Sequence, residues 1–247
     1  MKKTLYLILL LVLCICVSSS CSRGDDEPSA DILSLDSLID RRDEFDRKKI
    51  LRVSDLRHRL SSAGTPDERF TLNAQLYDEY LTYNSDSAMK YIDANLDIAR
   101  RSGNIERLNS SLIKKSYLQA AIGLLREAES LLDTVDRSKL TREQLVEYYG
   151  QKIYLYSHMG NYTGGETNEY YAKERSYKDS IMTVISPDHP EYLWYRAWDV
   201  IGTDRNDPDL NETMRRRLEH SSKDTRRDAM DAYVLARLYQ QAGDEAN

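Results

Sequence analysis

Apolar residues recur every three or four positions along most of this chain, and no stretch alternates strictly between apolar and polar residues. The first spacing places apolar side chains on one face of an α-helix, whereas half-buried strands require alternation. Short breaks that contain Gly, Pro or Asn separate the helix-length segments. The pattern therefore predicts an all-α protein built from consecutive helices.

The first amphipathic segment spans residues 31–63. Its polar positions carry acidic residues four places before basic ones, as in Glu44 and Lys48, and each such pair stabilises a helix by about 0.2–0.5 kcal/mol. Gly64 and Pro66 follow at positions where a helix ends. We expect one long charged amphipathic helix that caps a helical array or pairs with a partner helix.

Glycines follow the later helical segments at regular intervals. Gly123, Gly160, Gly202 and Gly243 are separated by 37, 42 and 41 residues. A period of roughly 34 to 45 residues is typical of solenoids built from helical hairpins. We therefore predict that residues 64–247 form a series of such hairpins.

The last of these units resembles the first helix of a tetratricopeptide (TPR) repeat. It carries a large apolar residue at Leu235, a small residue at Ala236, an aromatic residue at Tyr239 and a glycine at Gly243. The small residue lets a second helix approach closely, and the aromatic ring fills the space beside it. At the small position the four earlier units carry Leu76, Ser116, Ile153 and Tyr195. We predict a degenerate TPR-like solenoid that forms a right-handed superhelix.

The N-terminus carries the features of a signal peptide. Lys2 and Lys3 precede an apolar run from Leu5 to Val17. Such a run covers about 20 Å as a helix, whereas a bilayer span needs roughly 20 residues. We expect residues 1–20 to be cleaved during export.

The sequence Ser18-Ser19-Ser20-Cys21 resembles the lipobox of bacterial lipoproteins, in which the cysteine becomes the lipidated N-terminus. Lipoboxes usually carry Leu where Ser18 stands, and an ordinary secretory signal that ends near a cysteine is the alternative. Residues 21–30 are expected to form a flexible tether. Their acidic stretch is also similar to signals that direct some Gram-negative lipoproteins to the cell surface. We therefore expect a lipid anchor on Cys21, with the protein in the periplasm or on the outer-membrane surface.

Charge and cysteine content narrow the classes of function. Cys14 and Cys16 lie within the predicted signal peptide, so no disulfide and no thiolate metal site is expected in the mature chain. The formal net charge of −6 disfavours nucleic-acid binding by this segment. The arginines at 215–217 lie among acidic residues such as Glu212, an arrangement typical of a solvated helix face.

No residue combination has the spacing of a catalytic or metal-binding motif. The four histidines are scattered, and neither a paired-His motif nor a nucleophile elbow occurs. An acidic run at 204–212 lacks the central glycine of a calcium loop, so we interpret Asp207 as a helix N-cap and Pro208 as the first helical residue. We interpret His158 as a residue near a helix end marked by Gly160. We expect no catalytic residue, no metal and no cofactor.

Tyrosine supplies most of the aromatic side chains, with 18 Tyr against 2 Phe. Buried tyrosines pack by their rings and direct the hydroxyl to water or to a polar neighbour. Those outside the core would line the surface on which a TPR array holds an extended peptide or, less often, a glycan. The candidate residues for this groove are Tyr149, Tyr156, Tyr195, Trp198 and Tyr239.

Several motifs are similar to those of one lineage of TPR proteins. They are Leu35-x-x-Leu38-Ile39-x-Arg41-Arg42, Glu68-Arg69-Phe70-x-Leu72, Leu76-Tyr77-Asp78-Glu79-Tyr80, Tyr83-Asn84-x-Asp86-Ser87-Ala88 and Tyr177-x-Asp179-Ser180. Over nearly all residues from 31 to 243, the chain resembles the exported N-terminal sensor region of TPR-containing membrane regulators from Gram-negative gut anaerobes. In longer members that region precedes a transmembrane helix, a coiled coil and an output segment thought to bind DNA. The chain is therefore expected to be a truncated member or a stand-alone module.

The resemblance implies a non-catalytic sensor or interaction module of the cell envelope. We expect a peptide or protein partner in the groove and a membrane contact through the lipid on Cys21. The alternative is a surface glycan- or nutrient-binding lipoprotein with TPR-like helices, although such proteins are usually much longer. An enzyme is the least favoured interpretation.

Overall fold

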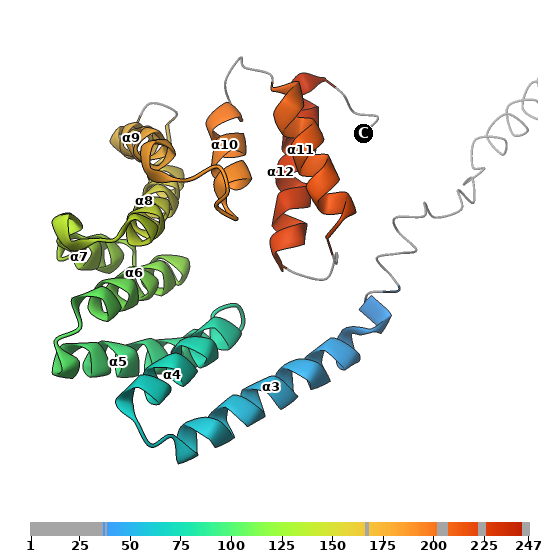
Figure 1. Ribbon diagram of the computed structural model, residues 1–247. Helices are drawn as coiled ribbons and strands as arrows, with labels where there is room; N and C mark the ends of the chain where they lie inside the picture. The colour runs from blue at the N-terminus through green and yellow to red at the C-terminus, as the bar shows by residue number, and fades with distance from the viewer. Residues whose placement is uncertain (1–36, 38, 166–167, 202–206, 222–225, 244–247) are drawn as a thin grey trace, which may run out of the picture. The chain divides into compact units, whose positions relative to one another are not determined.

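The computed structural model describes residues 37, 39–165, 168–201, 207–221 and 226–243. The predicted signal peptide, tether and Cys21 lie outside these residues, as does Gly202. The part of the chain that is described is helical and contains no β-strand, which confirms the predicted all-α class (Figure 1). With the labels of Figure 1, its helices are α3 (Arg42–Ser62), α4 (Pro66–Tyr80), α5 (Ser85–Ser102), α6 (Ile105–Ala121), α7 (Leu125–Asp133), the short 3-10 helix η1 (Arg137–Lys139), α8 (Arg142–Thr163), α9 (Glu169–Val184), α10 (Tyr192–Val200), α11 (Pro208–Glu219) and α12 (Arg226–Ala242).

The chain divides into two units, residues 1–52 and 53–247, and the boundary falls within α3. In the first unit a turn at Arg41 precedes α3. The Glu44 carboxylate accepts hydrogen bonds from Lys48 at 2.6 Å and from Arg41 at 3.1 Å, and these contacts lower the pKa of Glu44 to about 2. The charge pairing that the sequence predicts between Glu44 and Lys48 is therefore present. Ile50, also on α3, is exposed.

Capping residues fix where the helices of the second unit begin. The Thr65 hydroxyl accepts a hydrogen bond from the Glu68 amide, and Pro66 occupies the first turn of α4. At α11 the Asp207 carboxylate accepts from the Leu210 amide, with Pro208 in the first turn. The predicted N-cap role of Asp207 is confirmed.

The second unit consists of helical hairpins packed in chain order. Helix α4 packs on α5, α6 on α7, α8 on α9 and α10 on α11, and α12 packs on both α10 and α11. Neighbouring hairpins are joined because α6 contacts both α5 and α8, and α10 contacts α9, α11 and α12 (Figure 1). Contacts between successive first helices, such as α6 with α8 and α10 with α12, are those that a TPR-like array requires. The predicted helical-hairpin solenoid is confirmed.

Apolar side chains form a core that continues from one hairpin to the next. Val53 and Leu56 of α3 pack on the α4–α5 hairpin around Leu76 and Ile92. A second cluster extends from α5 to α9, a smaller one joins α8 to α9, and another joins α10, α11 and α12. Each fully buried aliphatic side chain stabilises the fold by about 1.5–3 kcal/mol.

Hydrogen bonds from buried side chains link the hairpins at defined positions. The Tyr77 hydroxyl on α4 donates to the Lys114 carbonyl on α6 at 2.8 Å. The Gln144 side chain on α8 donates to the Glu106 carbonyl on α6 at 2.7 Å. Because a buried polar group without a partner costs about 1–3 kcal/mol, these bonds also fix the register between helices.

The interpretation of Gly160 as a helix-ending residue is wrong. Helix α8 continues to Thr163 and ends at Gly164, whose φ is 71°. Gly160 is buried inside α8, where the Tyr171 ring of α9 lies over it. His158 is accordingly not in the last turn of its helix. Gly160 allows α8 and α9 to pack closely. From sequence spacing alone, such a glycine looks the same as one that ends a helix.

Candidate functional site: a charged face across the hairpins

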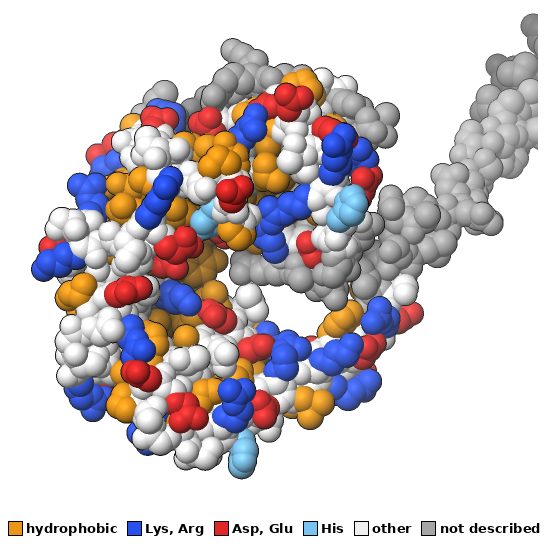
Figure 2. All heavy atoms as spheres, viewed as in Figure 1, with side chains coloured by type: hydrophobic (Ala, Val, Ile, Leu, Met, Phe, Trp, Pro, Cys, Tyr) orange, Lys and Arg blue, Asp and Glu red, His pale blue; other side chains and the backbone are white. Residues whose placement is uncertain are grey.

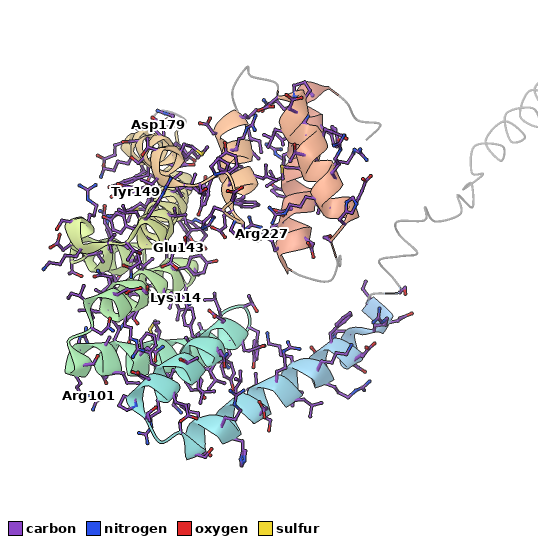
Figure 3. All side chains as sticks on the ribbon, in the orientation of Figure 1. Arg101, Lys114, Glu143, Tyr149, Asp179 and Arg227 are labelled. Carbon is purple, nitrogen blue, oxygen red and sulfur yellow. The ribbon has the colours of Figure 1, made fainter. Side chains whose placement is uncertain are left out.

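Successive hairpins bring charged side chains to one side of the second unit. Lys114 on α6, Glu143 on α8 and Arg227 on α12 lie along this side (Figure 3). Figure 2 shows acidic and basic side chains interleaved over α6 and α8. We define the charged face as Asp78, Lys114, Glu143, Glu147, His189, Glu191 and Arg227.

Helix α8 contributes to the charged face through its periodicity. Glu143, Glu147, Gly150 and Tyr154 follow at steps of four, three and four, which places them on the same side of the helix. A Cβ atom at Gly150 would clash with the Tyr195 hydroxyl of α10. Gly150 therefore allows α10 to approach α8 at the charged face.

Three ion pairs or hydrogen bonds connect the elements that form this face. Lys114 Nζ on α6 lies 3.5 Å from Asp78 Oδ1 on α4. His189 Nε2, in the loop before α10, lies 3.0 Å from Glu143 Oε1. Arg227 on α12 pairs with Glu191 at the start of α10 at 2.9 Å. Such partly exposed pairs contribute only about 0–1 kcal/mol each, so their main effect is to orient the side chains.

Glu147 is the carboxylate of this face whose charge is least compensated by its neighbours. It is half-buried, and its Oε2 atom is enclosed without a hydrogen-bond donor among the described residues. Burial raises the pKa of Glu147, Lys114 opposes that shift, and the carboxylates of Glu143, Glu191 and Asp78 add to it. The Glu147 carboxyl therefore holds its proton more tightly than an exposed glutamate does, and among the described residues its Oε2 atom has no donor to compensate the charge when it ionises.

Aromatic rings continue the charged face along α6 and α8. Tyr117 lies one turn after Lys114, and its ring centroid is 4.8 Å from that of Tyr154. The imidazole of His158 follows at 4.1 Å from Tyr154. This side of the second unit therefore combines charged groups with aromatic ring surface.

Comparison with known protein families explains this arrangement of hairpins. Residues 39–247 match the family described as the SusR N-terminal TPR domain. The chain belongs to this family. The match confirms the predicted resemblance to the TPR sensor region of a regulator family. Neither a curated protein nor a solved structure matches the chain.

Membership of the SusR N-terminal TPR domain family indicates the general class of function. TPR-type folds are typically non-catalytic, and they generally bind protein partners. The family therefore suggests a protein-interaction or sensor module. None of the helices in the described ranges combines the length and apolar character that a membrane span requires.

The five candidate groove aromatics lie in different environments of this TPR domain. Tyr156 is buried, with its hydroxyl donating to Glu129 at 3.1 Å and its ring stacked 5.7 Å from Tyr177. Burial also raises its pKa. Tyr149 is half-buried between two core clusters, 6.0 Å from the Tyr177 ring.

The remaining candidates belong to α10 and α12. Trp198 and Tyr239 are half-buried against the core cluster of α10, α11 and α12. Tyr195 packs beside the cluster that joins α8 to α9, and burial together with Glu191 raises the pKa of its hydroxyl. Of the five, only Tyr195 is thereby placed beside the charged face. A binding role for each of these aromatics stays a prediction.

Sequence reasoning missed Glu147, Lys114 and Tyr117 as candidate binding residues. On α8 the sequence does hold a signal, because Glu143, Glu147 and Gly150 are spaced by four and three residues and therefore share one face of the helix. The partners of that face come from other hairpins, however. Their proximity follows only from the packing of α4, α6, α8 and α10.

One buried lysine has a structural role, in contrast to the side chains of the charged face. Lys152 on α8 is 1% exposed, and its ammonium lies 2.8 Å from Asp133 Oδ1. The same ammonium lies 5.7 Å from the ring centroid of Tyr148 and 5.6 Å from that of Tyr156. Lys152 therefore packs within the α7–α8 junction, where a cation is stabilised by one carboxylate and two rings.

Proposed function

We propose that this TPR domain is a non-catalytic sensor module of the cell envelope that binds a peptide segment of a protein partner on its charged face. The observation that carries the proposal is the convergence of charged side chains from α4, α6, α8, α12 and the loop before α10, in a domain of a fold class that generally binds protein partners. Electrostatic complementarity across such a surface gives specificity and fixes the register of a bound segment.

Anchoring to the envelope is the second part of the proposal. It is supported by the apolar run from Leu5 to Val17 and by the serine-rich approach to Cys21. Metabolic labelling with a fatty-acid analogue is expected to mark the wild-type protein and to leave Cys21→Ala unmarked. Equal labelling of both proteins would refute lipidation at Cys21.

A role in signalling is the third part. The resemblance to the sensor region of membrane regulators supports a domain that detects a partner outside the cytoplasm and has a relay to the inside in longer relatives. The acidic net charge supports a partner other than nucleic acid for this segment. We propose no catalytic step because no residue combination in the sequence provides one.

Site-specific photocrosslinking tests where the partner binds. A crosslinking amino acid replaces Glu143, whose side chain is 68% exposed on the charged face, and in matched controls it replaces Arg101 or Asp179, which are exposed on α5 and α9 (Figure 3). We expect a defined peptide crosslinked from position 143 and from neither control. The identified peptide must then bind the purified domain in calorimetry.

Two results would contradict the proposed function. The first is equal crosslinking from all three positions, which would indicate non-specific contact. The second is the absence of any peptide adduct from position 143 in a protein that binds purified oligosaccharides, which would favour the glycan-binding alternative.

A further inference from the structure

The charged face carries information about the kind of segment that it binds. We propose that Glu147 accepts a lysine or arginine side chain of a peptide that lies across α6, α8 and α10. This inference rests on the proposed function, because it names the chemistry of the partner at that same surface.

The charge balance around Glu147 is the first argument. Asp78 has Lys114 as a partner, Glu143 has His189, and Glu191 has Arg227, at the distances given above. In the residues that the structure describes, Glu147 lacks an equivalent ion pair within 4.0 Å. A cation from a bound partner would give Glu147 the kind of contact that Asp78, Glu143 and Glu191 already have.

The placement of Glu147 is the second argument. Its Oε2 atom is enclosed without a donor, yet the residue as a whole is only half-buried. Because the charge of a carboxylate is shared by both oxygens, a cation that contacts the accessible part of the side chain neutralises it. A charge-assisted hydrogen bond formed there is stronger than one formed in open solvent, since the surroundings are partly desolvated.

The neighbouring elements supply the third argument. Lys114 on α6 lowers the pKa of Glu147, whereas Asp78 on α4, Glu143 on α8 and Glu191 at the N-cap of α10 raise it. Carboxylates therefore outnumber cations around this position. An incoming ammonium or guanidinium group would meet net attraction, and an incoming carboxylate would meet net repulsion.

The test uses four pools of acetylated and amidated heptapeptides with Lys, Arg, Gln or Glu fixed at the central position and uncharged residues randomised elsewhere. Binding is measured by fluorescence anisotropy with the full chain. We expect the Lys and Arg pools to bind wild type roughly tenfold more tightly than the Gln pool, and the Glu pool to bind most weakly.

Substitutions assign the effect to Glu147. Glu147→Gln is expected to remove the preference for Lys and Arg, whereas Glu127→Gln, on an exposed position of α7, is expected to retain it. Lys114→Gln removes the cation of the charged face that lowers the pKa of Glu147, so it should strengthen binding of the Lys and Arg pools. Circular dichroism verifies that each variant keeps its helical content.

The possible results separate this inference from the proposed function. If the Gln pool binds as tightly as the Lys pool, or if Glu147→Gln retains the preference, the inference is wrong while peptide binding stands. If no pool binds at all, both the inference and the proposed function are wrong. A preference that is present in wild type and Glu127→Gln, lost in Glu147→Gln and enhanced in Lys114→Gln supports the inference.

Discussion

The ring of Tyr171 on α9 lies over the backbone of Gly160 on α8, so closely that a Cβ at position 160 would be 2.5 Å from the ring atom Cε1. The Tyr171 hydroxyl donates a hydrogen bond to Asn161 at 2.7 Å, which holds the ring in place. Helices α8 and α9 therefore approach each other at a point where only glycine fits.

Gly160→Ala is expected to destabilise the domain although alanine has the higher helix propensity. Propensity alone would favour Ala by about 1 kcal/mol, whereas overpacking a close contact costs about 1–3 kcal/mol. Urea denaturation followed by circular dichroism should show a net loss of about 1 kcal/mol. Gly64→Ala, in the loop between α3 and α4, is the steric control, because nothing lies within 4 Å of a Cβ at that position. An increase in stability for Gly160→Ala would show that the ring moves aside freely.

Ser116 tests the close contact between α6 and α7. Its buried hydroxyl donates to the Ala128 carbonyl at 3.0 Å and accepts from the Gln151 amide at 3.2 Å. Ser116→Ala leaves both groups without that partner, and we expect a loss of about 1–3 kcal/mol of unfolding free energy. Ser176→Ala, on an exposed position of α9, should change stability by less than about 0.5 kcal/mol. Equal effects of the two substitutions would contradict the assigned role of Ser116.

Lys152 tests whether the buried cation acts by packing or by charge. Lys152→Ala removes a side chain that fills the α7–α8 junction, and we expect a loss of about 2–3 kcal/mol. Lys152→Met keeps most of the volume, and its lost partner Asp133 is 65% exposed and can be hydrated. We therefore expect Lys152→Met to lower the free energy of unfolding by less than half as much as Lys152→Ala does, as measured by thermal and urea denaturation. A larger cost for Met than for Ala would show that the charge dominates.

The pH dependence of stability tests the environment of Glu147. Its pKa is raised above the ordinary value of 4.5 in the folded state, mainly by burial, so the folded protein binds this proton more tightly than the unfolded chain does. Ionisation of Glu147 at neutral pH therefore reduces stability, and this cost disappears as the pH falls below 4.5.

Glu147→Gln should accordingly be more stable than wild type at pH 7, and the difference should shrink towards pH 4. Urea denaturation at the two pH values measures it. Glu127→Gln serves as the control, because that carboxylate is exposed on α7. A stability difference that grows as the pH falls would reverse the sign and refute the assignment.

Much of the fold follows from local sequence signals. The termini of α4 and α11 are encoded by Thr65-Pro66 and Asp207-Pro208, and the small residue Ser116 marks the contact with Ala128. These signals work because capping and close helix approach depend on residues near in sequence. Gly123 and Gly243 follow α6 and α12 with positive φ, as their spacing indicates.

The remainder depends on contacts between distant residues. Gly150 and Gly160 lie inside α8, where the missing Cβ leaves room for Tyr195 and Tyr171. The sequence around each glycine does not reveal which tyrosine packs on it. The burial of Lys152 likewise depends on a residue of another helix, because its partner Asp133 lies on α7. The charged face was missed for this reason, as it joins residues from four helices and from the loop before α10.

Nuclear magnetic resonance mapping of the binding surface tests the central claim most directly. The amide spectrum of the isotope-labelled domain is recorded during titration with the Lys-centred heptapeptide pool. We predict that the largest shift changes cluster at Lys114, Glu143, Glu147 and Tyr195. Changes concentrated instead around Tyr156 and Tyr177, or no changes at saturating peptide, would contradict the account.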